Sequence, residues 1–75
     1  MEKIIVEIAA KAIKVSLEEA ESHCKEINDI DAYYFWNPAR GGLSVIVNSN
    51  GEKLAAASSV NFDRHLEEFK KGRRN

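Results

Sequence analysis

The chain has three residues whose side chains commonly bind zinc or pair as nucleophile and base: His23, Cys24 and His65. A structural zinc site needs four ligands. His23 and Cys24 are adjacent, so on a helix they diverge by about 100° and do not act on one ligand. Only an approach of His65 to Cys24 across two packed helices would form a nucleophilic pair. The sequence therefore predicts no metal, no cofactor and no enzyme activity, with one buried cysteine and two surface histidines.

Four of the six aromatic residues form one run, Tyr33-Tyr34-Phe35-Trp36. Successive side chains of a strand point to opposite faces, so Tyr33 and Phe35 face one way and Tyr34 and Trp36 the other. Both faces therefore need a cover, and the pattern does not say which face is core. Aromatic rings fill cores, but they are also enriched at protein interfaces and stack on bases.

The segment 37–42 follows this run and contains one arginine, Arg40, with two glycines. Such a composition can form an anion-binding nest of backbone amides. The spacing is not that of a phosphate-binding loop, and a connection between two strands accounts for the glycines. Arg40 is therefore kept as a candidate binding residue beside the aromatic run.

The composition is that of a single globular domain spanning residues 1–75, with 44% hydrophobic residues, 31% charged residues and one proline. A domain of this size buries only about 60% of the surface that its unfolded chain exposes. Self-association would add buried area, so a homodimer is expected. One cysteine forms no internal disulfide, which favours a reducing, cytoplasmic setting.

The net charge of −1 hides an asymmetry along the chain. Residues 70–75 carry four basic side chains and a charge of +4, so residues 1–69 carry −1 minus +4, which is −5. We expect the basic end to fray and nucleic acid to be an unfavoured partner of an acidic body. Neither a signal peptide nor an apolar run near eighteen residues is present, so no membrane association is expected.

The first elements are the hardest to assign. Residues 3–15 are rich in β-branched side chains, which favours two short strands, 3–8 and 12–15. Their charged residues also recur at helical spacing, so one amphipathic helix is the alternative. Ser16 followed by Glu19 matches a capping box and predicts a helix from Leu17 to about Asn28.

Asn50-Gly51 between two strand-like runs is a strong hairpin signal. A two-residue loop there would place Val47 opposite Leu54. The opposite face of this hairpin carries Ile46 among small residues, so another chain could approach closely there. Asn61 is the predicted N-cap of a last helix that ends near Gly72.

Together these elements predict an α+β fold in the order (β-β)-α-β-β-β-α, with an antiparallel sheet and both helices packed on one of its faces. The predicted function is a small protein-interaction module that binds itself or another protein. The alternative is a nucleic-acid-associated module, because the order α-β-β-β-α from Leu17 to Gly72 is similar to that of double-stranded-RNA-binding domains. The candidate interface residues are Tyr33, Tyr34, Phe35, Trp36, Arg40 and Ile46.

Overall fold

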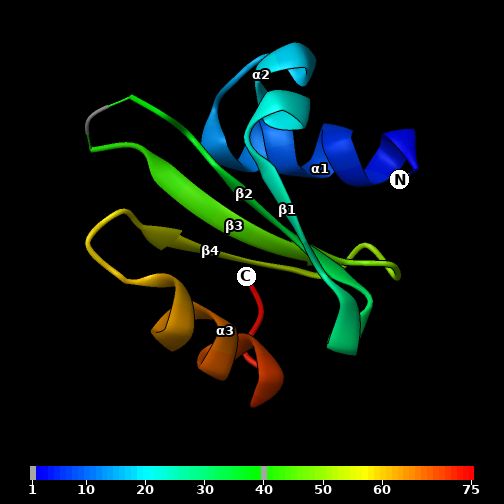
Figure 1. The fold of residues 1–75 in the computed structure, drawn as a ribbon, viewed down its shortest axis with the longest axis vertical. Coiled ribbons are helices and arrows are strands. Elements are labelled where there is room, and N and C mark those ends of the chain that lie inside the picture. Colours follow the sequence, from blue (N-terminus) through cyan, green and yellow to red (C-terminus); the bar gives the residue numbers. More distant parts are fainter. Residues whose placement is uncertain (1, 40) are drawn as a thin grey trace.

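The computed structural model of the protein describes residues 2–39 and 41–75. Its elements in chain order are helix α1 (Lys3–Ile13), helix α2 (Leu17–Ser22), strand β1 (Cys24–Ile27), the 3-10 helix η1 (Asn28–Ile30), strands β2 (Ala32–Trp36), β3 (Leu43–Asn48) and β4 (Lys53–Ala57), and helix α3 (Phe62–Lys70). The strands form one antiparallel sheet in the order β1-β2-β3-β4 (Figure 1). The predicted α+β class is confirmed.

The N-terminal segment is one helix, α1. The two strands predicted for 3–8 and 12–15 are wrong, and the alternative, an amphipathic helix, is confirmed. One face of α1 is buried against the sheet, and its residues recur at helical spacing. They are Ile5, Val6, Ala9, Ala10 and Ile13. Because alanine is small, the helix axis can approach the sheet closely at the middle of this face.

Helix α2 begins as predicted and ends early. The Ser16 hydroxyl accepts a hydrogen bond from the Glu19 amide at 3.1 Å, and the Glu19 carboxylate accepts one from the Ser16 amide at 3.4 Å. The helix ends at Ser22 and not near Asn28, because residues 24–27 pair with β2 as strand β1. This pairing satisfies backbone groups of both segments, and it prevails over the helical spacing of the apolar residues.

Strands β3 and β4 form the hairpin that Asn50-Gly51 predicts, but its loop has three residues and not two. The Asn48 amide donates to the Glu52 carbonyl at 3.0 Å and closes the loop. Gly51 has a φ of +85°, the left-handed conformation that ends a three-residue hairpin loop.

The longer loop changes the pairing register. Val47 lies opposite Lys53 and not opposite Leu54, which pairs instead with Ile46. A shift of one residue moves every side chain of a strand to the other face. Leu54 therefore packs with Ile46, and not with Val47 as predicted.

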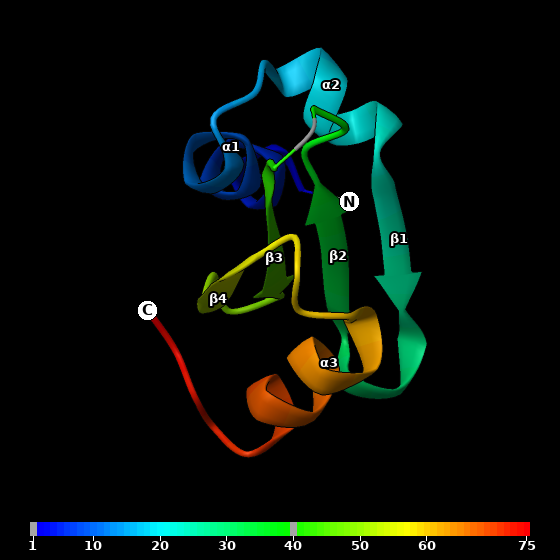
Figure 2. The same cartoon turned by 90° about the vertical axis from the view of Figure 1, so that its left-hand side faces the viewer.

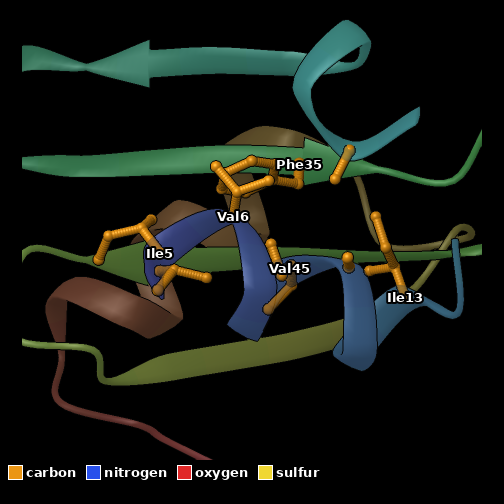
Figure 3. Packing of buried hydrophobic residues seen from close by; sticks show 9 residues of the cluster. Ile5, Val6, Ile13, Phe35 and Val45 are labelled. Atoms are coloured by element: carbon orange, nitrogen blue, oxygen red, sulfur yellow. The ribbon is translucent and has the colours of Figure 1, made fainter. Parts of the chain in front are cut away.

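The helices lie on opposite faces of the sheet, so the prediction that both pack on one face is wrong (Figures 1 and 2). Helices α1 and α2 cover the face that carries Phe35 and Val45. Figure 3 shows Phe35 beside Val6 of α1, with Ile5 and Ile13 on opposite sides of Val6 along the same helix. This side of the sheet holds the larger of the two hydrophobic clusters.

Helix α3 covers the other face. Phe69 of α3 packs there with Ile27, Ala32 and Ile46, and all four residues are buried. The chain therefore places its own helices on both faces of the sheet, although Tyr34 and Trp36 of the aromatic strand stay half-buried on the α3 side. The need for a cover on each face, which the aromatic run implied, is thus met in large part within the chain.

The basic end of the chain, for which fraying is predicted, folds back on the body in the structure. The Arg74 guanidinium lies 3.7 Å from the centroid of the Phe69 ring. Lys70 donates to the Asp29 carboxylate at 3.0 Å and holds the pKa of Asp29 below its ordinary value. These contacts tie the end of α3 to the core and to η1.

Asn75 covers the outer edge of β4. The Asn75 side chain accepts a hydrogen bond from the Ala55 amide at 2.8 Å and donates one to the Ala55 carbonyl at 3.0 Å. The Asn75 backbone amide donates to the Lys53 carbonyl, and the Val60 amide donates to the Ala57 carbonyl. Asn75 thus occupies the place of a further strand on this edge.

Replacing Asn75 with alanine should open this edge locally. The change Asn75→Ala removes both side-chain hydrogen bonds to Ala55, a loss of about 1 kcal/mol. Amide hydrogen exchange measured by NMR should be about fivefold faster at Ala55. Exchange at Ile46, an inner residue of β3, is the control and should change much less. An unchanged rate at Ala55 would contradict the contact.

Candidate functional site

The six predicted interface residues do not form one surface. Phe35 and Ile46 are each 0% exposed, so a surface role for them is contradicted. Tyr33 packs against the cluster beneath α1. Arg40 lies outside the described residues.

Tyr34 and Trp36 lie together on the α3 side of the sheet, and both are half-buried. They line a hollow of about 370 Å³ beside Phe62, the first residue of α3. The Tyr34 ring centroid lies 5.8 Å from that of Trp36, with the planes at 29°, and 4.8 Å from that of Phe62, with the planes at 76°. Three rings thus form a continuous aromatic surface in the hollow.

Two residues of β1 and its preceding turn complete this surface. The Lys25 ammonium lies 4.4 Å from the centroid of the Phe62 ring, and the His23 ring meets Trp36 edge to face at 5.8 Å. Lys25 lies opposite Tyr34 in the register. The sequence interpretation missed His23 and Lys25 because it placed them on a helix, and a strand at 24–27 would have put Lys25 next to Tyr34.

A buried hydrogen-bonded pair lies between this hollow and α3. Ser44 lines the hollow, and its hydroxyl lies 3.3 Å from His65 Nδ1, while His65 Nε2 lies 2.6 Å from the Leu54 carbonyl. Because a carbonyl only accepts, Nε2 carries the hydrogen, and in the neutral ring Nδ1 accepts from the Ser44 hydroxyl. His65 is 1% exposed, so the prediction that it is a surface histidine is wrong.

This serine and histidine have the spacing of a nucleophile and its base. The Ser44 side chain is nevertheless almost wholly enclosed, at 3% exposed. Both ring nitrogens of His65 are engaged within the fold. The pair therefore ties α3 to strands β3 and β4.

Cys24 lies on the other side of the sheet from His65, packed against the cluster beneath α1. The pairing of Cys24 with His65 that a nucleophilic site would need is not formed. Burial raises the pKa of the Cys24 thiol, and the Glu26 carboxylate adds to this effect. A raised pKa lowers the share of the reactive thiolate.

A metal centre and a membrane-spanning helix are two further features that residues 2–39 and 41–75 could contain. Within these ranges no three His, Cys, Asp or Glu side chains lie together so that they could hold a metal ion. No helix in the same ranges is long and apolar enough to cross a membrane.

The described part of the loop 37–42 is organised by Asn37. Its side chain donates to the Ile13 carbonyl at 2.9 Å and accepts from the Ala39 amide at 2.9 Å. A Cβ atom on Gly42 would lie 2.7 Å from the Asn37 Cβ, so this position requires glycine. Close packing therefore accounts for Gly42.

The four basic side chains of the C-terminal end are each within 4.0 Å of a carboxylate. The pairs are Lys70 with Asp29, Lys71 with Glu67, Arg73 with Glu68, and Arg74 with Glu52. Phosphate groups would have to compete with these carboxylates. The segment from Leu17 to Gly72 also contains four strands and not three, so the order on which the similarity to double-stranded-RNA-binding domains rested is not present.

Further hollows lie elsewhere on the surface. One, of about 540 Å³, is on the outer side of α1 and α2, where Ile4 is 53% and Leu17 38% exposed. Another, of about 500 Å³, lies between α3 and β4, and the residues that line it include Arg64, Glu68 and Arg73. Neither gathers the aromatic residues that the sequence singles out.

Comparisons with protein-family models, with curated proteins and with solved structures find no match to this chain.

Proposed function

We propose that the protein is a small interaction module that binds another polypeptide through the aromatic hollow formed by Tyr34, Trp36 and Phe62. The observation that carries this proposal is the placement of three adjoining rings in a concave surface that α3 leaves uncovered. Half-buried aromatic side chains supply large contact area at low entropic cost and are frequent hot spots of protein interfaces.

The partner is proposed to be a different protein, in a reducing, cytoplasmic setting that suits the single Cys24. A homodimer was expected because self-association adds buried area to a small domain and because both faces of the aromatic strand needed a cover; helices α1 and α3 now lie on those two faces. Ile46, which was expected at a contact between copies, is buried beneath α3. Self-association is therefore kept as an outcome of the experiment below.

Replacing Trp36 with alanine should weaken binding strongly and leave the fold intact. Trp36 belongs to neither hydrophobic cluster, so its removal takes away contact surface and little core. We expect wild-type protein on a solid support to enrich clones from a phage library of random 12-residue peptides. The enriched peptides should bind the Trp36→Ala variant about thirtyfold more weakly, as expected for an interface hot spot worth about 2 kcal/mol.

Leu17→Ala is the matched control, because it truncates an exposed apolar side chain on the α1 side of the sheet. It should bind the selected peptides like wild type. Sedimentation across a concentration series tests the homodimer: a dimer that Trp36→Ala dissociates would make the partner a second copy. The proposal would be overturned if no peptide is enriched and the protein is a monomer at all concentrations. It would also be overturned if the Trp36→Ala variant binds the selected peptides as tightly as wild type.

If such a monomer retards RNA or DNA in a gel, the nucleic-acid alternative is favoured.

A further inference from the structure

The outer edge of β1 carries backbone groups without partners in the sheet. The Trp36 amide donates to the His23 carbonyl, and β1 then pairs with β2 in a regular antiparallel register. Hydrogen-bonded and non-hydrogen-bonded pairs alternate along such a ladder. The amides and carbonyls of Cys24 and Glu26 therefore point away from β2, and no hydrogen bond joins them to any residue of 2–39 or 41–75.

The two edge strands of this sheet, β1 and β4, differ in how many of their outward backbone groups are hydrogen-bonded. On β4, the outward carbonyl of Lys53 and both backbone groups of Ala55 bond to Asn75, and the Ala57 carbonyl bonds to Val60. On β1, the four outward backbone groups of Cys24 and Glu26 have no hydrogen-bond partner within residues 2–39 and 41–75. An exposed strand edge of this kind is a template on which another strand can pair.

The side chains of β1 specify the charge of such a strand. Lys25 is exposed on the side of the aromatic hollow, and its ammonium contacts the Phe62 ring and no carboxylate among the described ion pairs. Glu26 is exposed on the opposite side. Directly opposed residues of two strands interact, and opposite charges stabilise the pair.

We propose that β1 accepts an extended segment of a partner protein as a fifth strand, with a carboxylate opposite Lys25 and a basic side chain opposite Glu26. The inference rests on the proposed interaction function and names how the partner binds. The added strand would lie beside His23 and Lys25, which border the aromatic hollow. A second part of the same partner could then reach Trp36.

A second copy of this chain does not fit the edge. When two copies of this chain pair their β1 edges about a two-fold axis, the strands are antiparallel. The residue at the axis then lies opposite the same residue of the other copy. An axis at Lys25 opposes two ammonium groups and an axis at Glu26 opposes two carboxylates, and like charges directly opposite destabilise a sheet. An axis at Cys24 would draw Ser22 into the strand, although it ends helix α2.

The test is an NMR titration with a synthetic peptide, acetyl-Thr-Val-Lys-Glu-Val-Thr-Thr-amide, and with versions methylated at one backbone nitrogen at a time. Amide shifts of Cys24 and Glu26 should move on binding. Methylation should weaken binding about tenfold at every second position, because only alternate amides of an added strand face β1. The wild-type protein should prefer this lysine-glutamate peptide to a peptide with two central lysines, because the glutamate lies opposite Lys25. The Lys25→Glu variant should show the reverse preference and bind the peptide with two central lysines about fivefold more tightly.

Lys11→Glu on α1 is the matched control, since it changes the net charge equally and lies away from β1; it should keep the wild-type preference. The inference is overturned if the peptide at 5 mM, about the millimolar range of weak contacts, leaves the Cys24 and Glu26 amides unshifted. It is also overturned if methylation has no alternating effect. Either failure, together with Trp36-dependent binding of selected peptides, would leave the interaction function standing and remove only strand addition.

Discussion

Replacing Phe35 with alanine should destabilise the protein more than any other single truncation in the sheet. Phe35 is 0% exposed beneath α1 and is the largest fully buried side chain of the described residues. A buried Phe to Ala change costs about 3 to 5 kcal/mol through lost burial and the cavity that remains. A domain of this length has about 4 to 11 kcal/mol in total. The Phe35→Ala variant is therefore expected to be close to unfolded at 37 °C.

Thermal unfolding followed by circular dichroism measures this effect. A loss of about 4 kcal/mol corresponds to a fall in Tm of about 20 °C for a domain of this size. Phe62→Ala is the matched control, because it makes the same chemical change at the half-exposed start of α3, and it should cost about 1 kcal/mol. Equal costs for the two variants would contradict the placement of Phe35 in the core.

Replacing His65 with alanine should also destabilise the protein strongly, because it breaks a buried polar connection. The ring bonds to the Ser44 hydroxyl and to the Leu54 carbonyl, and its edge meets the Tyr34 ring at 5.8 Å. Each unpaired buried polar group costs about 1 to 3 kcal/mol, and the lost ring leaves a cavity. We expect His65→Ala to lose about 3 kcal/mol in urea denaturation.

A double-mutant cycle with Ser44→Ala separates the hydrogen bond from the cavity. Ser44→Ala alone should cost about 1 kcal/mol, and the double variant should cost less than the sum of the two single variants. The hydroxyl that His65→Ala leaves unpaired is absent from the double variant. Strictly additive costs would mean that Ser44 and His65 do not interact, and would overturn the role assigned to this pair.

Much of the local structure could be predicted from the sequence. The capping box at Ser16, the N-cap at Asn61, the aromatic strand and the hairpin around Gly51 are all present. Each depends on contacts within a few residues, so its signal lies in a short window. Of the candidate site, Tyr34 and Trp36 were found by the same local reasoning, since they point to one side of a strand.

The errors arose where distant segments decide the outcome or where one short sequence is compatible with two turn types. The segment 24–27 has the spacing of a helix, but the aromatic strand offers it a backbone partner. The register of β4 changed because the loop closes through Asn48 and Glu52, a choice between two turn types that Asn-Gly alone does not make. The sequence interpretation did not include Lys25 and Phe62 in the site, and only the folded structure places them beside Tyr34 and Trp36.

The aromatic run by itself determined that this strand has two apolar faces, and no more. A side chain alternates sides by backbone geometry alone, so this much is local. Only the tertiary structure decided that α1 covers Phe35, that α3 covers Ile46 but leaves Trp36 beside a hollow, and that β1 and β4 differ at their edges. Which helix covers which face depends on loop lengths and on the summed burial of residues far apart in sequence, and no short window contains that sum.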